Sequence, residues 1–285
     1  MLADLGLLYC AVFWGVSFVT MKILVGLYPA CWLLFLRFSC GSLLLYVFFR
    51  RRIHEHIKPA LKGGVLIGLF LFLAIASQTV GLNYIGGGRS AFISATYVLM
   101  VPLMLWAVRR EFPGWVKLFA AGLCVAGMYF LTGEDVSEAS MTGDALTVIC
   151  ALTFAVQVIV IASYAQGSDP LALSFVEFVS FAVFALIGSL AFESRPVLID
   201  TNSFPELLFT IIFATFGCYS MQVWAQKYAE PSHATIIMSL ESVFGLVSSI
   251  IFLGETLTLR AGVGCALIFV SVLASELEPY LHARS

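Results

Sequence analysis

Charged side chains are scarce in this sequence. Only 11% of its 285 residues are Asp, Glu, Lys or Arg, whereas 61% are apolar. A soluble domain carries about 25% charged and about 45–50% apolar residues. So few polar residues could not cover the surface of a soluble protein of this size, and lipid is the expected solvent. The formal net charge of -2 and the lack of a basic stripe argue against a nucleic-acid partner.

Motifs of catalytic and metal chemistry are missing as well. The sequence has no HExxH, no GxSxG and no paired aspartates within facing apolar runs. Its seven cysteines form no CxxC pair and none stands beside a histidine at metal-ligand spacing, so we interpret them as packing residues. The histidines lie at or near the ends of apolar runs (His54, His56, His233 and His282). We therefore expect no enzyme, no metal and no cofactor.

Long apolar runs dominate what is present. A transmembrane helix needs about 17–25 mostly apolar residues, and the sequence contains ten such runs. They cover residues 5–26, 30–49, 63–82, 88–108, 115–131, 143–165, 170–192, 207–226, 232–253 and 259–275. The first is too long for a signal peptide and lacks its basic flank, so we expect it to be retained. The sequence predicts an all-α membrane protein with ten transmembrane helices.

The distribution of Lys and Arg over the connections predicts the orientation, because cytoplasmic loops carry an excess of both. With the N-terminus inside, the cytoplasmic side holds most of them: Arg50, Arg51, Arg52, Lys58, Lys62, Arg109, Arg110, Lys117, Lys227 and Arg284. The outside holds Lys22, Arg89, Arg195 and Arg260. Both termini are therefore predicted to be cytoplasmic.

The chain shows signs of an internal duplication. A shift of 144 residues lays 78–84 on 222–228, and a shift of 140 lays Asp4 on Asp144. Each copy would hold five spans, in halves 1–136 and 137–285. Five is odd, so the second copy enters the membrane inverted, with a pseudo-two-fold axis in the membrane plane. Two such halves can exchange conformations and open the centre to alternate sides, which is a property of secondary transporters.

Several motifs resemble the drug/metabolite transporter superfamily, in its ten-helix EamA-type branch. The similar segments are Trp14-Gly15-Val16-Ser17-Phe18 with Lys22, Pro29 through Arg37-Phe38, Ala91-Phe92-Ile93 with Tyr97-Val98 and Val101-Pro102-Leu103, and Leu240 through Phe244 with Gly254-Glu255. The family often has proline where Ser242 stands, which puts a kink there in doubt. The resemblance implies export of amino acids and related metabolites, or uptake of small solutes, at the cytoplasmic (inner) membrane of a bacterium.

Glu241 is the most conspicuous residue within the spans. It is the tenth residue of the 232–253 run and would lie near the bilayer centre. A carboxylate there costs on the order of 2.5–3.5 kcal/mol. It should face the protein interior and bind a proton or a cation, or else bond neighbouring helices. The other charges within spans, Arg37 and Glu177, are predicted to be structural.

Further polar and aromatic residues suggest a central pocket. The repeat sets Tyr97 against Glu241 and Gln78 against Gln222, as a two-fold-related site would need. The predicted substrate pathway comprises Trp14, Ser17, Gln78, Ser94, Tyr97, Gln157, Gln222 and Glu241. Small residues instead mark 115–131 and 259–275, which are predicted to pack together at the seam between the halves or to form a dimer face.

The leading hypothesis is a secondary transporter that exports amino acids or related metabolites by alternating access. Proton antiport through Glu241 and uncoupled facilitated diffusion are both open. The alternatives are a proton-coupled exporter of drugs or cationic compounds, an uptake system, and, from another class, an intramembrane enzyme or a channel. The expected partners are a small-molecule substrate and membrane lipids, with the protein a monomer or weak homodimer.

Overall fold

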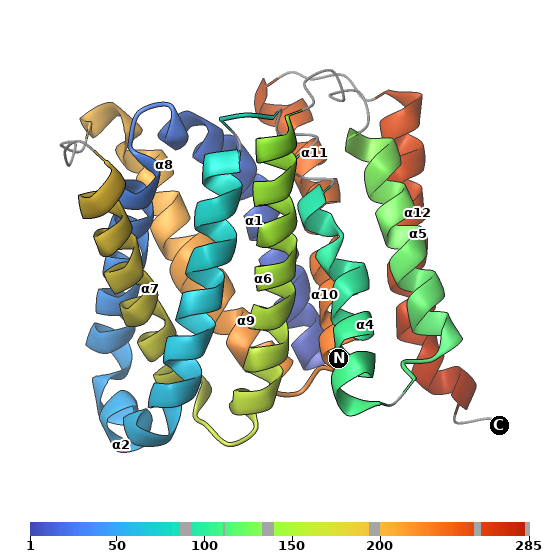
Figure 1. Cartoon of the computed structure of the whole chain (residues 1–285), viewed down its shortest axis with the longest axis horizontal. Coiled ribbons are helices and arrows are strands. Elements are labelled where there is room, and N and C mark those ends of the chain that lie inside the picture. Colours follow the sequence, from blue (N-terminus) through green and yellow to red (C-terminus); the bar gives the residue numbers. More distant parts are fainter. Residues whose placement is uncertain are drawn as a thin grey trace.

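Apolar helices running roughly parallel to one another form the bundle in this computed structural model (Figure 1). The structure describes residues 1–81, 83–85, 90, 93–110, 112–132, 140–193, 200–253 and 258–282. Within these residues all regular structure is helical. The motif residues 91–92 and 254–255, and the acidic connection 133–139, lie outside the described residues.

The helices follow the predicted spans in order. They are α1 (Leu2–Val25), α2 (Ala30–Gly81), α4 (Tyr97–Arg109), α5 (Trp115–Thr132), α6 (Met141–Ala165), α7 (Pro170–Phe192), η1 (Thr201–Ser203), α8 (Phe204–Phe209), η2 (Thr210–Gly217), α9 (Cys218–Gln226), α10 (Pro231–Met238), α11 (Glu241–Leu253) and α12 (Leu259–His282). Within the described part of the chain, six helical stretches are by length and composition able to cross a membrane: 2–25, 30–81, 141–165, 170–192, 201–226 and 231–252. Shorter apolar helices cover 93–108, 115–130 and 259–274. The protein is thus a multi-pass helical membrane protein, and the number of ten crossings stays a prediction.

The long helix α2 contains two of the predicted spans. The residues between them, 50–62, are helical as well, and only Phe49 leaves the helical conformation, with φ -126° and ψ 17°. This single break lets the chain reverse, and the two arms of α2 run antiparallel in Figure 1. The turn is rich in Arg, Lys and His yet buries Ile53 and Ala60, so it forms an amphipathic cap rather than a loop.

The predicted span 232–253 is broken in its middle. Helix α10 ends before Ser239 and α11 begins at Glu241. At the break Leu240 donates its backbone N–H to the carbonyl of Ile237 at 3.1 Å, a tighter i→i+3 pattern. The regular helix is therefore interrupted here without a proline at Ser242.

A similar break precedes α4. Thr96 forms a turn and donates its N–H to the Ile93 carbonyl at 3.2 Å, and α4 begins at Tyr97. The shift of 144 residues that relates the two halves lays Tyr97 on Glu241. Both helices therefore restart at the same place in the repeat.

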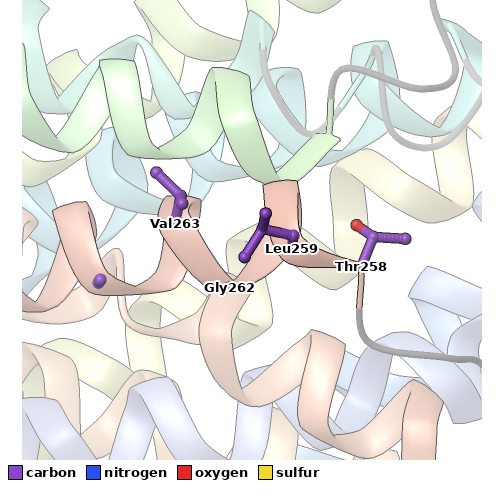
Figure 2. A pocket seen from close by; sticks show the side chains of 5 residues that line it. Thr258, Leu259, Gly262 and Val263 are labelled. Carbon is purple, nitrogen blue, oxygen red and sulfur yellow. The ribbon is translucent and has the colours of Figure 1, made fainter.

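Helices α5 and α12 pack closely against each other, as their small residues predicted. A Cβ on Gly127 would lie 2.8 Å from the Gly264 backbone oxygen, so the two backbones touch. The small-residue faces are not buried throughout, because Gly122 and Gly262 have open space around them. Gly262 instead lines a groove of about 520 Å³ with Thr258, Leu259, Val263 and Ala266 (Figure 2). The groove lies on α12, which stands at one edge of the bundle in Figure 1.

Candidate functional site

Tyr219 of α9 is the centre of an aromatic cluster that joins four helices. Its ring centroid lies 5.0 Å from that of Trp14 (α1), 5.4 Å from Phe38 (α2) and 6.4 Å from Phe178 (α7). Tyr219 itself is only 6% exposed. Sequence inspection missed this residue, since a lone aromatic side chain in an apolar run is unremarkable, and only its neighbours from distant segments reveal its position.

The π-helix η2 lies beside this cluster. π-Helical turns are rare and frequently occur at functional sites. The Trp14 indole donates to the Ala214 carbonyl at 3.0 Å, and the Arg37 Nε donates to the Thr215 hydroxyl at 3.1 Å. Directly after η2, the Cys10 thiol donates to the Cys218 carbonyl at 3.2 Å. Side chains from α1 and α2 thus hold the irregular segment in place.

Glu241 lies where α1 crosses α11. A Cβ on Gly15 would be 2.7 Å from the Glu241 backbone oxygen and 2.5 Å from the Phe244 Cβ, so only glycine fits this crossing. The Glu241 side chain is half-buried, and it lies within electrostatic range of Tyr97 and Tyr219. An acidic group with partial access inside the bundle can exchange a proton or meet a cationic group.

Tyr97 and Phe154 form the counterpart of this crossing. Their rings meet edge to face with centroids 4.8 Å apart, and Tyr97 is 5% exposed. The repeat lays Phe154 on Trp14 and Tyr97 on Glu241. In the repeat, α4 corresponds to α11 and α6 corresponds to α1. The α4–α6 contact is therefore the counterpart of the α1–α11 contact.

Two glutamines meet in the interior. Gln222 Nε2 donates to Gln157 Oε1 at 3.4 Å, and neither side chain is exposed. The remaining amide atoms, Gln157 Nε2 and Gln222 Oε1, have no hydrogen-bond partner among the described residues. Burying a polar atom without a hydrogen-bond partner costs free energy of folding, so these two free amide atoms can be satisfied by a polar ligand or by water.

The remaining predicted pathway residues are Ser17, Gln78 and Ser94. Ser17 is buried, but its hydroxyl donates to the Trp14 carbonyl of its own helix at 2.7 Å. Gln78 and Ser94 are half-buried. The structure therefore brings Trp14 near Tyr219, and Glu241 against Gly15 of α1. A pathway role for any of these residues stays a prediction.

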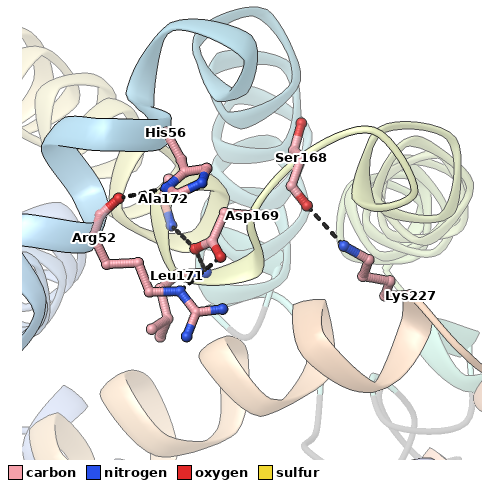
Figure 3. A network of polar contacts seen from close by, with 7 residues as sticks. All are labelled: Arg52, His56, Ser168, Asp169, Leu171, Ala172 and Lys227. Carbon is pink, nitrogen blue, oxygen red and sulfur yellow. Dashed lines mark hydrogen bonds and ion pairs between the residues drawn. The ribbon is translucent and has the colours of Figure 1, made fainter.

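Ionic contacts tie together the connections at one end of the bundle (Figure 3). The Arg52 guanidinium lies 2.8 Å from the Asp169 carboxylate, which also caps α7 by accepting the backbone N–H groups of Leu171 and Ala172. The Lys227 ammonium donates to the Ser168 carbonyl at 3.1 Å. The chain turns of α2, α6–α7 and α9–α10 are thereby joined.

The same kind of contact continues along α5, α10 and α1. Lys117 pairs with Glu230 at 2.5 Å, and His233 lies 3.2 Å from Asp4. Arg52, Lys117 and Lys227 are among the residues predicted to face the cytoplasm. Among the described residues, no group of three or more His, Cys, Asp or Glu side chains could hold a metal ion.

Comparison with known proteins identifies the family. The model of the EamA-like transporter family matches residues 1–133 and again 141–276. An uncharacterized transporter of Archaeoglobus fulgidus is 33% identical over 97% of this chain and 86% of its own length. The threonine/homoserine exporter RhtA of Escherichia coli is 30% identical over 78% of this chain and 74% of its own length.

A solved crystal structure shares the fold, with a TM-score of 0.83 over 96% of both chains at 14% identity. The sequence relatives cover most of the chain. The chain therefore belongs to the EamA-like transporter family, within the drug/metabolite transporter superfamily.

Proposed function

We propose that this transporter exports small amino acids or closely related metabolites across the bacterial cytoplasmic membrane by alternating access. The observation that carries the proposal is the pair of helix breaks at Tyr97 and Glu241. Broken helices at mid-membrane place backbone ends and polar side chains around a substrate site in many transporters. Here Glu241 begins α11 where that helix crosses α1 at Gly15, and Tyr97 contacts Phe154 of α6, the helix that also carries the buried Gln157.

The proposed architecture has ten spans in two inverted five-helix halves, 1–136 and 137–285, and works as a monomer or weak homodimer. Two separate matches to one family model, one in each half, support the duplication. So do the corresponding contacts of α1 with α11 and of α6 with α4. Exchange of conformation between the halves would open the Tyr219 cluster to one side and then the other.

Both termini are proposed to be cytoplasmic. A fluorescent protein fused after Ser285 should therefore survive protease added to intact spheroplasts and be digested only after the membrane is lysed. An alkaline phosphatase fusion at the same residue should be inactive, because that enzyme folds outside the cytoplasm. Digestion in intact spheroplasts would overturn the orientation.

The substrate class rests on similarity to RhtA, whose name assigns it threonine and homoserine. Purified protein in liposomes should move radiolabelled threonine with saturable kinetics. It should accumulate threonine when protons flow down their gradient in the direction opposite to the movement of the amino acid. Gradient-dependent accumulation would support antiport, whereas equilibration without accumulation would support facilitated diffusion. Saturable movement of cationic drugs without movement of any amino acid would favour the drug-export alternative.

A further inference from the structure

Two charged side chains lie deep in the bundle without a counter-ion among the described residues. Arg37 of α2 is 5% exposed, and Glu177 of α7 is fully buried. In the part of the chain that the structure describes, neither forms an ion pair. A buried charge without a partner costs several kcal/mol, so an unpaired cation and an unpaired acid need an explanation.

The neutral contacts of Arg37 use only part of its guanidinium. Its Nε donates to the Thr215 hydroxyl, and its Nη1 lies 3.1 Å from the Met21 sulfur, a weak acceptor. A guanidinium has five N–H donors arranged to bind a carboxylate through two parallel hydrogen bonds. Arg37 is therefore held in position by Thr215, and among the described residues no carboxylate accepts a hydrogen bond from its guanidinium.

Glu177 is even less satisfied. Neither of its carboxyl oxygens has a hydrogen-bond partner among the described residues, although the Gln157 side chain lies beside it. Gln157 in turn bonds Gln222 and leaves its own amide nitrogen unpartnered. The Gln157 nitrogen is a donor, so the free acceptors here are the two Glu177 carboxyl oxygens. They can accept hydrogen bonds from a cation that carries several N–H donors, such as an ammonium group.

Tyr219 links the two unpaired charges. Its ring centroid lies 5.4 Å from that of Phe38, the residue after Arg37, and 6.4 Å from that of Phe178, the residue after Glu177, and its ring also packs on Trp14. A carboxylate receptor and an ammonium receptor thus flank one aromatic wall.

We propose that Arg37 and Glu177 bind the two ends of a zwitterionic amino acid, its carboxylate at Arg37 and its ammonium group at Glu177. The proposal rests on the amino-acid export proposed above and replaces the structural role expected from sequence. Glu241 is then left for proton coupling, separate from ligand recognition.

The test measures binding of radiolabelled threonine to the purified protein in detergent, in competition with two analogues. Threoninamide lacks the carboxylate, and 2,3-dihydroxybutyrate lacks the ammonium group. Wild-type protein should bind threonine more tightly than either analogue, by on the order of tenfold or more. Equal binding of either analogue would overturn the proposal without any variant being needed.

The variants assign each end of the ligand to one residue. Arg37→Gln should weaken threonine binding and remove the preference over threoninamide, while Glu177→Gln should remove the preference over 2,3-dihydroxybutyrate. The exposed pair Arg51→Gln and Glu55→Gln provides matched controls, which should bind as wild type. Should Arg37→Gln fail to fold, Arg37→Lys should keep the preference over threoninamide but bind threonine more weakly.

The outcomes separate this proposal from the proposed function. If the wild-type protein binds and transports no amino acid, amino-acid export is wrong and the zwitterion site is wrong with it. If the wild type binds threonine while both glutamine variants fold and keep its selectivity, export stands and this site is wrong. Restored binding in an Arg37→Glu, Glu177→Arg double variant would instead indicate that the two residues pair with each other.

Discussion

Glu241→Gln is expected to abolish proton-driven accumulation of threonine in liposomes, so that the variant accumulates no more threonine with a proton gradient than without one. Glutamine keeps the size and hydrogen-bonding capacity of the side chain but cannot take up or release a proton. Glu241 is half-buried at the start of α11, within electrostatic range of Tyr97 and Tyr219. A carboxyl group at this restart of the helix can alternate between a proton and a cationic partner as the halves move.

The variant should still equilibrate threonine across the membrane, because the proposed ligand contacts at Arg37 and Glu177 are unchanged. Counterflow of labelled threonine against unlabelled threonine measures this residual movement independently of the gradient. Glu55→Gln, at an exposed position in the α2 turn, is the matched control and should accumulate threonine as wild type does. Unchanged accumulation by Glu241→Gln would show that coupling, if any, uses another group.

Gly15→Ala is expected to destabilise the protein by about 1–3 kcal/mol, the usual cost of overpacking an interior. A methyl group there would lie 2.5 Å from the Phe244 Cβ, 2.7 Å from the Glu241 carbonyl oxygen and 2.8 Å from the Gly245 nitrogen. Two of these three atoms belong to the backbone, so no side-chain rotation can relieve the contact. Helix α11 would have to move away from α1, and Glu241 would move with it.

The fall in unfolding temperature of the detergent-purified variant measures this effect. Gly122→Ala introduces the same methyl group on α5, where nothing lies within 4 Å, and should leave the unfolding temperature unchanged or slightly higher. Threonine transport by Gly15→Ala should fall as well, since the crossing positions the proposed coupling residue. Equal unfolding temperatures for the two variants would contradict the close α1–α11 crossing.

Much of the protein's general character followed from composition alone. The scarcity of charge and the apolar runs identify a helical membrane protein, and residues 14–18 and 240–244 carry the family resemblance that the comparisons confirm. Small residues also predicted the packing of α5 on α12. These properties are local, because each depends on residues close together in the chain and on the solvent they require.

The candidate site was only partly predictable. Trp14, Tyr97 and Glu241 are conspicuous as polar or aromatic residues inside apolar runs. Tyr219, the π-helix η2 and the break before Glu241 have no comparable signal, since helix propensity does not distinguish them from regular spans. Arg37 and Glu177 were expected to be structural, because the sequence cannot show whether a buried charge has a partner.

The sequence by itself thus determined the solvent, the helical class and the family of this protein. The tertiary structure decided which polar groups meet, because Arg37, Glu177 and Tyr219 are separated by long stretches of chain and approach one another only when α2, α7 and α9 pack. It also showed where the helices break: the i→i+3 turns at Thr96 and Leu240 contain no proline, and hydroxyl groups of Thr96 and Ser239 donate to backbone carbonyls of the preceding turn, because such side chains offer the backbone an alternative to regular helical bonding.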